Sequence, residues 1–137
     1  MFILDKGFAE EMIAHAREEV PNEACGLLAG VNGRVTKLYR CSSAEKSPYR
    51  YFVDAKEQLQ AMREIDEKGW ELLGIYHSHT HTEAYPSKTD VELAFYPDAL
   101  HFIVSLADWE QPVIRAFRIV DEKIIEVKLL MVEMMES

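Results

Sequence analysis

Apolar residues recur at helical spacing in two segments of the chain. Between residues 5 and 20 they return every three or four positions, and Pro21 then supplies a stop. The second segment starts after Asp54, a residue type that caps helices, and ends at Gly69, a usual signal for a helix C-terminus. The pattern predicts two amphipathic helices, over residues 5–20 and 54–69.

Elsewhere, β-branched and other apolar residues gather in short runs that are typical of strands. Two early runs flank Asn32 and Gly33, a pair that tolerates the positive φ angles of a tight hairpin turn. The run at 70–79 is nearly continuous in apolar residues, as expected for a strand in the middle of a sheet. The predicted strands are 25–30, 31–41, 49–53, 70–79, 99–108, 112–121 and 123–132, and a further helix is predicted at 87–96.

Two helices among early strands and a strand-rich carboxyl half predict an α/β (α+β) fold with a mixed sheet flanked by helices. The sequence has no internal repeat or linker, so we expect residues 1–137 to form a single domain. A chain of this length can bury one core without disulfides or a structural metal. A metal ion, if present, would therefore serve chemistry.

The balance of acidic and basic residues argues against some classes of binding partner. The chain has 24 acidic and 15 basic residues, a net charge of −9 that opposes binding to a nucleic-acid backbone. The apolar start meets Asp5 and Lys6 at once, and no run approaches the ~18 apolar residues of a membrane span. We expect a cytoplasmic protein with no nucleic-acid or membrane partner. Cys25 and Cys41 are then free thiols, and we assign them no role.

The segment "HSHTHTEAYPSKTD", residues 77–90, carries the candidate chemistry. On an extended strand His77 and His79 share one face at a separation of about 6.5 Å along the chain, which one metal ion can bridge. Catalytic zinc usually takes three protein ligands, so a third donor is needed. Asp90 can return from the first turn of the next predicted helix. The residues thus predict a metal site where a strand meets a loop.

The same segment resembles the signature of the JAMM (MPN-plus) zinc metallopeptidases: His-x-His, seven residues, Ser, two residues, Asp. Upstream, "PNEACGLLAG" is similar to the family segment that carries a catalytic glutamate, which points to Glu23. The similarity covers about residues 5–120 and indicates the short standalone prokaryotic type. There is one departure, because Thr80 stands where family members commonly have proline. We can place no counterpart of His81 in the family and interpret it as a solvated loop residue, with contact to the substrate as the alternative.

The resemblance implies a JAMM fold, a curved mixed sheet shared in outline with cytidine deaminases. It also implies one zinc ion per chain, held by His77, His79 and Asp90. Glu23 would move a proton from the attacking water to the leaving amine. Composition alone could not single out this glutamate, because the chain has many others.

Two serines near the ligands have structural and functional interpretations. Ser87 and the aspartate three residues on resemble a capping box, in which the serine hydroxyl caps the helix. In the family the serine at this position donates to the tetrahedral oxyanion. We expect full geometry for only one of these roles and favour the oxyanion role. Ser78 lies between the ligands and faces away from them, so we interpret it as support or packing.

The implied activity is zinc-dependent hydrolysis of an amide or isopeptide bond. By resemblance, the substrate is the tail of a ubiquitin-like or sulfur-carrier protein, cut after its C-terminal Gly-Gly. The alternative is a catalytically silent MPN-type protein-binding scaffold, which would lack one or more of the four motif positions. At the carboxyl end, residues 129–137 are apolar enough to allow a homodimer, although core packing followed by a frayed tail is the preferred interpretation.

Overall fold

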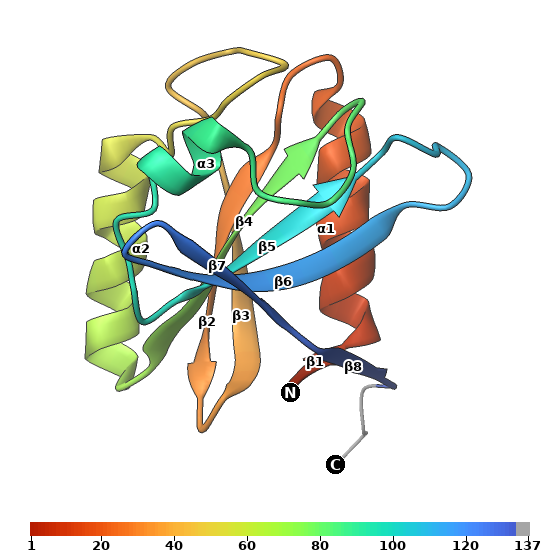
Figure 1. Cartoon of the computed structure of the whole chain (residues 1–137). Coiled ribbons are helices and arrows are strands. Elements are labelled where there is room, and N and C mark those ends of the chain that lie inside the picture. The colour runs from red at the N-terminus through yellow and green to blue at the C-terminus, as the bar shows by residue number, and fades with distance from the viewer. Residues whose placement is uncertain (134–137) are drawn as a thin grey trace.

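The computed structural model of the chain describes residues 1–133 and folds them into a mixed sheet with helices on both faces (Figure 1). The helices are α1 (Lys6–Glu19), α2 (Ala55–Lys68) and α3 (Lys88–Glu92). The strands are β1 (Phe2–Asp5), β2 (Cys25–Val31), β3 (Arg34–Cys41), β4 (Glu71–His79), β5 (Leu100–Ser105), β6 (Val113–Val120), β7 (Lys123–Val127) and β8 (Leu129–Val132).

Six strands form the main sheet in the order β3-β2-β4-β5-β6-β7, and β1 pairs with β8 in a separate parallel pair. Within the main sheet β4 and β5 are parallel, whereas the other neighbours are antiparallel. The predicted central position of β4 is confirmed, since it lies between β2 and β5. Its apolar stretch is explained by this position, because both of its faces are covered.

Alternation along the strands divides the core into layers. Tyr76 on β4 packs in the apolar cluster that includes Met12 of α1. Ile75, the preceding residue, packs in a second cluster that includes Ala61 of α2. The helices α1 and α2 therefore cover opposite faces of the sheet, as Figure 1 shows. Because His77 follows Ile75 by two positions, its side chain lies on the α2 face.

The two long predicted helices and the hairpin are confirmed. The side chain of Asp54 accepts a hydrogen bond from the Glu57 N–H, and Gly69 ends the helix with a φ of 69°. The turn between β2 and β3 has φ angles of 53° at Asn32 and 75° at Gly33, as a tight hairpin requires. Local capping and turn chemistry fixed these boundaries to within a residue or so.

Three predicted elements are wrong in part, and one strand was missed. Residues 49–53 form no regular strand and contribute only an isolated bridge between Ser43 and Val53. The predicted helix at 87–96 ends at Glu92, and the predicted strand at 123–132 divides into β7 and β8. Strand β1 was missed because it is short and pairs with β8 from the other end of the chain. Such a contact leaves no local pattern to find.

The two cysteines are free and buried, as expected, and they lie opposite each other on β2 and β3. Burial raises the pKa of each thiol to about 12, which makes Cys25 and Cys41 poor nucleophiles. Among the described residues, no helix is both long and apolar enough to cross a membrane. Residues 129–132 are in β8, whereas 134–137 lie outside the described part, so the homodimer stays a prediction.

Candidate metal centre

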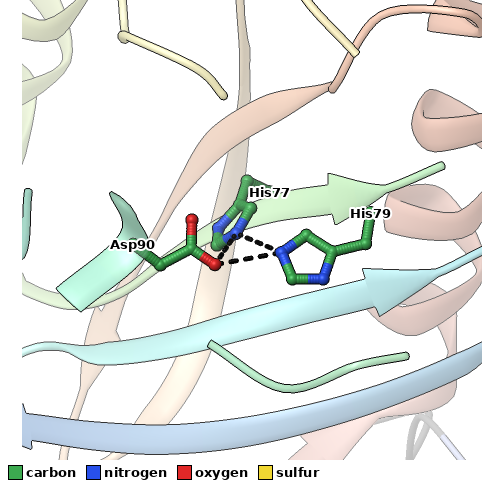
Figure 2. Close-up of side chains that lie close together, drawn as sticks. All are labelled: His77, His79 and Asp90. Atoms are coloured by element: carbon green, nitrogen blue, oxygen red, sulfur yellow. Dashed lines mark hydrogen bonds and ion pairs between the residues drawn. The ribbon is translucent and has the colours of Figure 1, made fainter. Parts of the chain in front are cut away.

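Three side chains converge where β4 ends (Figure 2). His77 and His79 come from alternate positions of β4, and Asp90 comes from α3. The two Nε2 atoms are 3.3 Å apart. The Oδ2 atom of Asp90 lies 3.1 Å from Nε2 of His77 and 3.0 Å from Nε2 of His79. All three residues are buried, so the structure brings the three predicted ligands together.

The spacing of these donors fits a tetrahedral zinc ion. Zinc–ligand bonds of ~2.0–2.1 Å at tetrahedral angles place neighbouring ligand atoms about 3.3 Å apart. The three separations, 3.0, 3.1 and 3.3 Å, are close to this value. Two imidazoles and one carboxylate are also a common donor set for catalytic zinc.

Hydrogen bonds orient two of the three donors. Nδ1 of His79 donates to the carbonyl oxygen of Glu83 at 2.8 Å, so Nε2 is the ring atom that faces Asp90 and would bind a metal in place of its proton. The backbone N–H of Ser87 donates to Oδ2 of Asp90 at 2.9 Å. Burial alone would raise the pKa of Asp90, but its hydrogen bonds with both histidines outweigh burial and hold the pKa well below its ordinary range. Asp90 is therefore a carboxylate, as a ligand must be.

Glu23 lies just before β2, and hydrogen bonds to Ser47 and Ser78 hold the backbone of Glu23 and Ala24. The Glu23 N–H donates to the carbonyl oxygen of Ser47 at 2.8 Å. The next N–H, of Ala24, donates to Oγ of Ser78 at 2.8 Å, and Ser78 N–H donates to the Ala24 carbonyl at 3.1 Å. Ser78 therefore ties the glutamate's segment to the strand that carries the histidines. The supporting role predicted for Ser78 is confirmed.

The carboxyl group of Glu23 is almost fully buried, and its Oε1 atom has no hydrogen-bond partner within residues 1–133. The pKa of Glu23 is raised to about 8, chiefly by burial; His79 lowers it in part and the negative charge of Asp90 adds to the rise. Buried polar atoms without partners are rare because they cost stability. A carboxyl group in this state can hold a proton at neutral pH and release it when the surrounding charge changes.

Glu23, His79 and Ser87 border one cleft of about 200 Å³. The remaining residues of its wall are Pro48, Tyr49, Thr80, His81 and Thr82. The structure thus brings the predicted proton carrier, one predicted ligand and the predicted oxyanion donor to a single cavity. His81 is exposed, as expected, but it also borders the cleft, and its Nδ1 is 2.8 Å from the hydroxyl oxygen of the buried Thr80.

Ser87 forms the predicted capping box with Asp90. Its Oγ accepts a hydrogen bond from the Asp90 N–H at 3.1 Å, and its own N–H donates to the Asp90 carboxylate. The cap uses a lone pair of the hydroxyl oxygen, whereas an oxyanion would use the hydroxyl proton. The observed cap therefore leaves the hydroxyl proton available, and the oxyanion role of Ser87 stays a prediction. Capping and donation are compatible.

Sequence reasoning missed the contribution of residues 48–51. Pro48 and Tyr49 border the cleft, and the ring of Tyr51 stacks on the imidazole of His77. The only signal in the sequence was a cluster of aromatic residues, which we interpreted as a strand. Nothing local indicated that the segment lies against the metal centre.

Comparison with known proteins decides the family. Residues 5–120 match the sequence family described as prokaryotic homologs of the JAB domain. The chain belongs to this family. It is 42% identical over 135 residues to the CysO-cysteine peptidase of Mycobacterium tuberculosis, which covers 97% of this chain and 92% of that protein. It is 33% identical over 103 residues to the desampylase of Haloferax volcanii, which covers 70% of this chain and 74% of that protein.

A solved structure supports the fold independently. The solution structure of a protein from Desulfitobacterium hafniense matches this chain with a TM-score of 0.88 and 39% identity, over 99% of this chain and 96% of that one. The family, the mixed α+β fold and the hydrolase activity predicted from the sequence are thereby confirmed.

Proposed function

We propose that this chain is a zinc-dependent metallopeptidase that cuts the amide or isopeptide bond after the C-terminal Gly-Gly of a ubiquitin-like or sulfur-carrier protein. One zinc ion per chain is held by His77, His79 and Asp90. The observation that carries the proposal is their convergence to within 3.3 Å near the buried carboxyl group of Glu23, whose Oε1 has no hydrogen-bond partner within residues 1–133. Such a group of buried ionisable side chains does not help an apolar core to pack.

When bound, zinc supplies Lewis acidity toward the scissile carbonyl and lowers the pKa of a water molecule from ~15.7 toward 7. Glu23 takes one proton from the attacking water and gives it to the nitrogen of the leaving amine as the C–N bond breaks. Burial raises the pKa of Glu23 to about 8, which suits a group that both accepts and releases a proton near neutral pH. The hydroxyl proton of Ser87, at the edge of the cleft, donates to the developing oxyanion.

The proposed substrate class is supported by the size of the cleft and by the names of the relatives. The M. tuberculosis relative is named a CysO-cysteine peptidase, and one from Thermus thermophilus is named a probable TtuB-protein conjugate cleaving protease. The cleft is small, and Tyr49 and Thr80 stand in its wall. An extended tail that ends in two glycines has no side chains to clash with such walls. A bulky residue before the scissile bond would be excluded.

A direct assay tests this proposal. A sulfur-carrier protein with a residue or short peptide after its Gly-Gly end is incubated with the chain and examined by mass spectrometry, with and without a zinc chelator. Wild type should release the extension only when chelator is absent. Glu23→Ala should keep its zinc and lose turnover, whereas Asp90→Ala should lose zinc as well.

The outcomes separate the enzyme from the silent scaffold. Full activity of Glu23→Ala would refute the mechanism. The chain could instead bind one zinc ion and release neither a C-terminal extension nor a lysine linked through an isopeptide bond. That result would refute the substrate class and favour the protein-binding scaffold.

A further inference from the structure

The two histidines of the metal centre are held in different ways. His79 donates from Nδ1 to the Glu83 carbonyl. His77 has no equivalent bond, because its buried Nδ1 finds no hydrogen-bond partner in the described part of the chain. Metal-binding histidines almost always donate their second ring N–H to an acceptor, which fixes the plane of the ring. A different restraint must therefore orient His77.

The ring of Tyr51 lies against the imidazole of His77 and can supply this restraint. It stacks on the imidazole of His77 with centroids 4.5 Å apart and planes 19° from parallel. The torsion that turns a histidine ring about its bond to Cβ is broad and shallow, so a neighbouring flat surface readily selects one orientation. Nε2 of His77 points at the Asp90 carboxylate in this orientation, at 3.1 Å.

Tyr51 is itself held firmly. Its side chain packs against the apolar cluster that contains Leu27 and Ile75, on the α2 face of the sheet. The backbone of the same segment accepts the hydrogen bond from Glu23 at Ser47, four residues earlier. The irregular segment between β3 and α2 thus contacts the proton carrier at one point and a metal ligand at another.

We propose that Tyr51 is a positioning residue for the metal centre: stacking by its ring, in place of a hydrogen bond to Nδ1, aims Nε2 of His77 at the metal. This inference rests on the proposed zinc site and concerns a residue outside the ligand set. It makes the aromatic ring the essential feature and leaves the phenolic hydroxyl dispensable.

The test measures zinc affinity on the folded protein by competition with a chromophoric chelator. Tyr51→Leu removes the ring and keeps apolar bulk, and its zinc dissociation constant should rise about 10-fold, the lower end for loss of a group that orients a ligand. Tyr51→Phe keeps the ring and should bind zinc like wild type. Tyr96→Leu is the matched control, because Tyr96 packs in the same cluster and borders the same apolar pocket as Tyr51. It should lose stability but not zinc affinity.

Cobalt substitution gives a second readout that a general loss of stability would not change. The visible absorption of bound Co²⁺ depends on the geometry of its ligands, so Tyr51→Leu should alter the spectrum and Tyr51→Phe should not. Thermal unfolding of the zinc-free variants checks that each is folded, and Tyr51→Met replaces the leucine variant if that one is not.

Two results would overturn the inference: wild-type zinc affinity and cobalt spectrum in Tyr51→Leu, or an equal loss in Tyr51→Phe, which would assign the effect to the hydroxyl. A wild-type chain that binds no zinc would instead refute the proposed function. The two failures are therefore distinguishable.

Discussion

Glu23, the proposed proton carrier, is a single residue whose burial makes the stability of the fold depend on pH. Its carboxyl group is buried, and burial raises its pKa from 4.5 to about 8. In the unfolded chain the same group ionises near the ordinary value. Between these two pKa values the unfolded state has released its proton while the folded state still holds it. The contribution of this group to stability is therefore complete at acid pH and is lost as pH rises through about 8.

The variant Glu23→Gln should remove this pH dependence while keeping the size of the side chain. In the zinc-free protein we expect it to raise the melting temperature clearly at about pH 8 and hardly at all at about pH 4, because below the ordinary pKa of 4.5 the folded and unfolded states both hold the proton. Thermal unfolding in a chelator at both pH values measures the effect. An equal gain at the two values would show that Glu23 has an ordinary pKa in the folded protein.

Ser87 caps helix α3 with the same hydroxyl group for which we propose a catalytic role. In Ser87→Ala, loss of the cap should cost about 1 kcal/mol of unfolding free energy. Loss of an oxyanion donor should lower kcat by ~10²–10³. Ser87→Thr keeps the hydroxyl and should stay near wild type in both. Denaturant unfolding and steady-state kinetics separate the two roles, and an unchanged kcat in the alanine variant would leave Ser87 with the cap alone.

At the scale of elements, the sequence predicts what local chemistry decides. Helix α2 has a capping aspartate at one end and a glycine with positive φ at the other, so its bounds were readable. The hairpin at Asn32 and Gly33 was equally local. The pair β1 and β8 joins residues such as Phe2 and Leu129, and no short-range pattern marks so distant a contact.

The same distinction applies to the candidate site. The spacing of His77 and His79 on a strand indicated a shared face, and Asp90 could be found because it follows closely. Glu23 required the resemblance, since nothing in its own surroundings distinguishes it from other glutamates. Tyr51 could not be found, because its segment looks like a strand and its stacking on His77 arises only when α2 and β4 pack together.

The close approach of β2 and β4 makes Gly26 a sensitive position. A Cβ atom there would overlap the ring of Tyr76 and the carbonyl of Tyr39, and Tyr76 cannot move easily because its hydroxyl is 2.7 Å from Nδ1 of His15. Gly26→Ala should therefore destabilise the fold by ~1–3 kcal/mol through overpacking. Gly33→Asn is the control, because the turn there is open and asparagine tolerates its φ of 75°. Equal denaturation midpoints for the two variants would contradict this packing.

In the whole molecule, the main apolar cluster and the proposed metal centre lie on opposite faces of the sheet. The cluster beneath α1 is apolar and has no metal ligand in it, with Met12, Tyr76 and Phe102 fully buried. The proposed ligands lie on the other face, where the parallel neighbours β4 and β5 end together. Two hydrogen bonds close this end: the Leu106 N–H donates to the His79 carbonyl, and the Ser105 hydroxyl donates to the Thr82 carbonyl.

Because the cluster beneath α1 contains none of the proposed ligands, we expect removal of zinc to leave a folded protein. After treatment with a chelator we expect unchanged far-ultraviolet circular dichroism and a cooperative thermal transition at a lower temperature. Restored zinc should stabilise the chain by mass action, by ~4 kcal/mol at a free concentration 1,000 times the dissociation constant. Asp90→Ala should show no such zinc-dependent shift, although it folds. Loss of helical and strand signal on chelation would contradict this view and would make zinc a structural requirement of the fold, as in small domains that unfold without it.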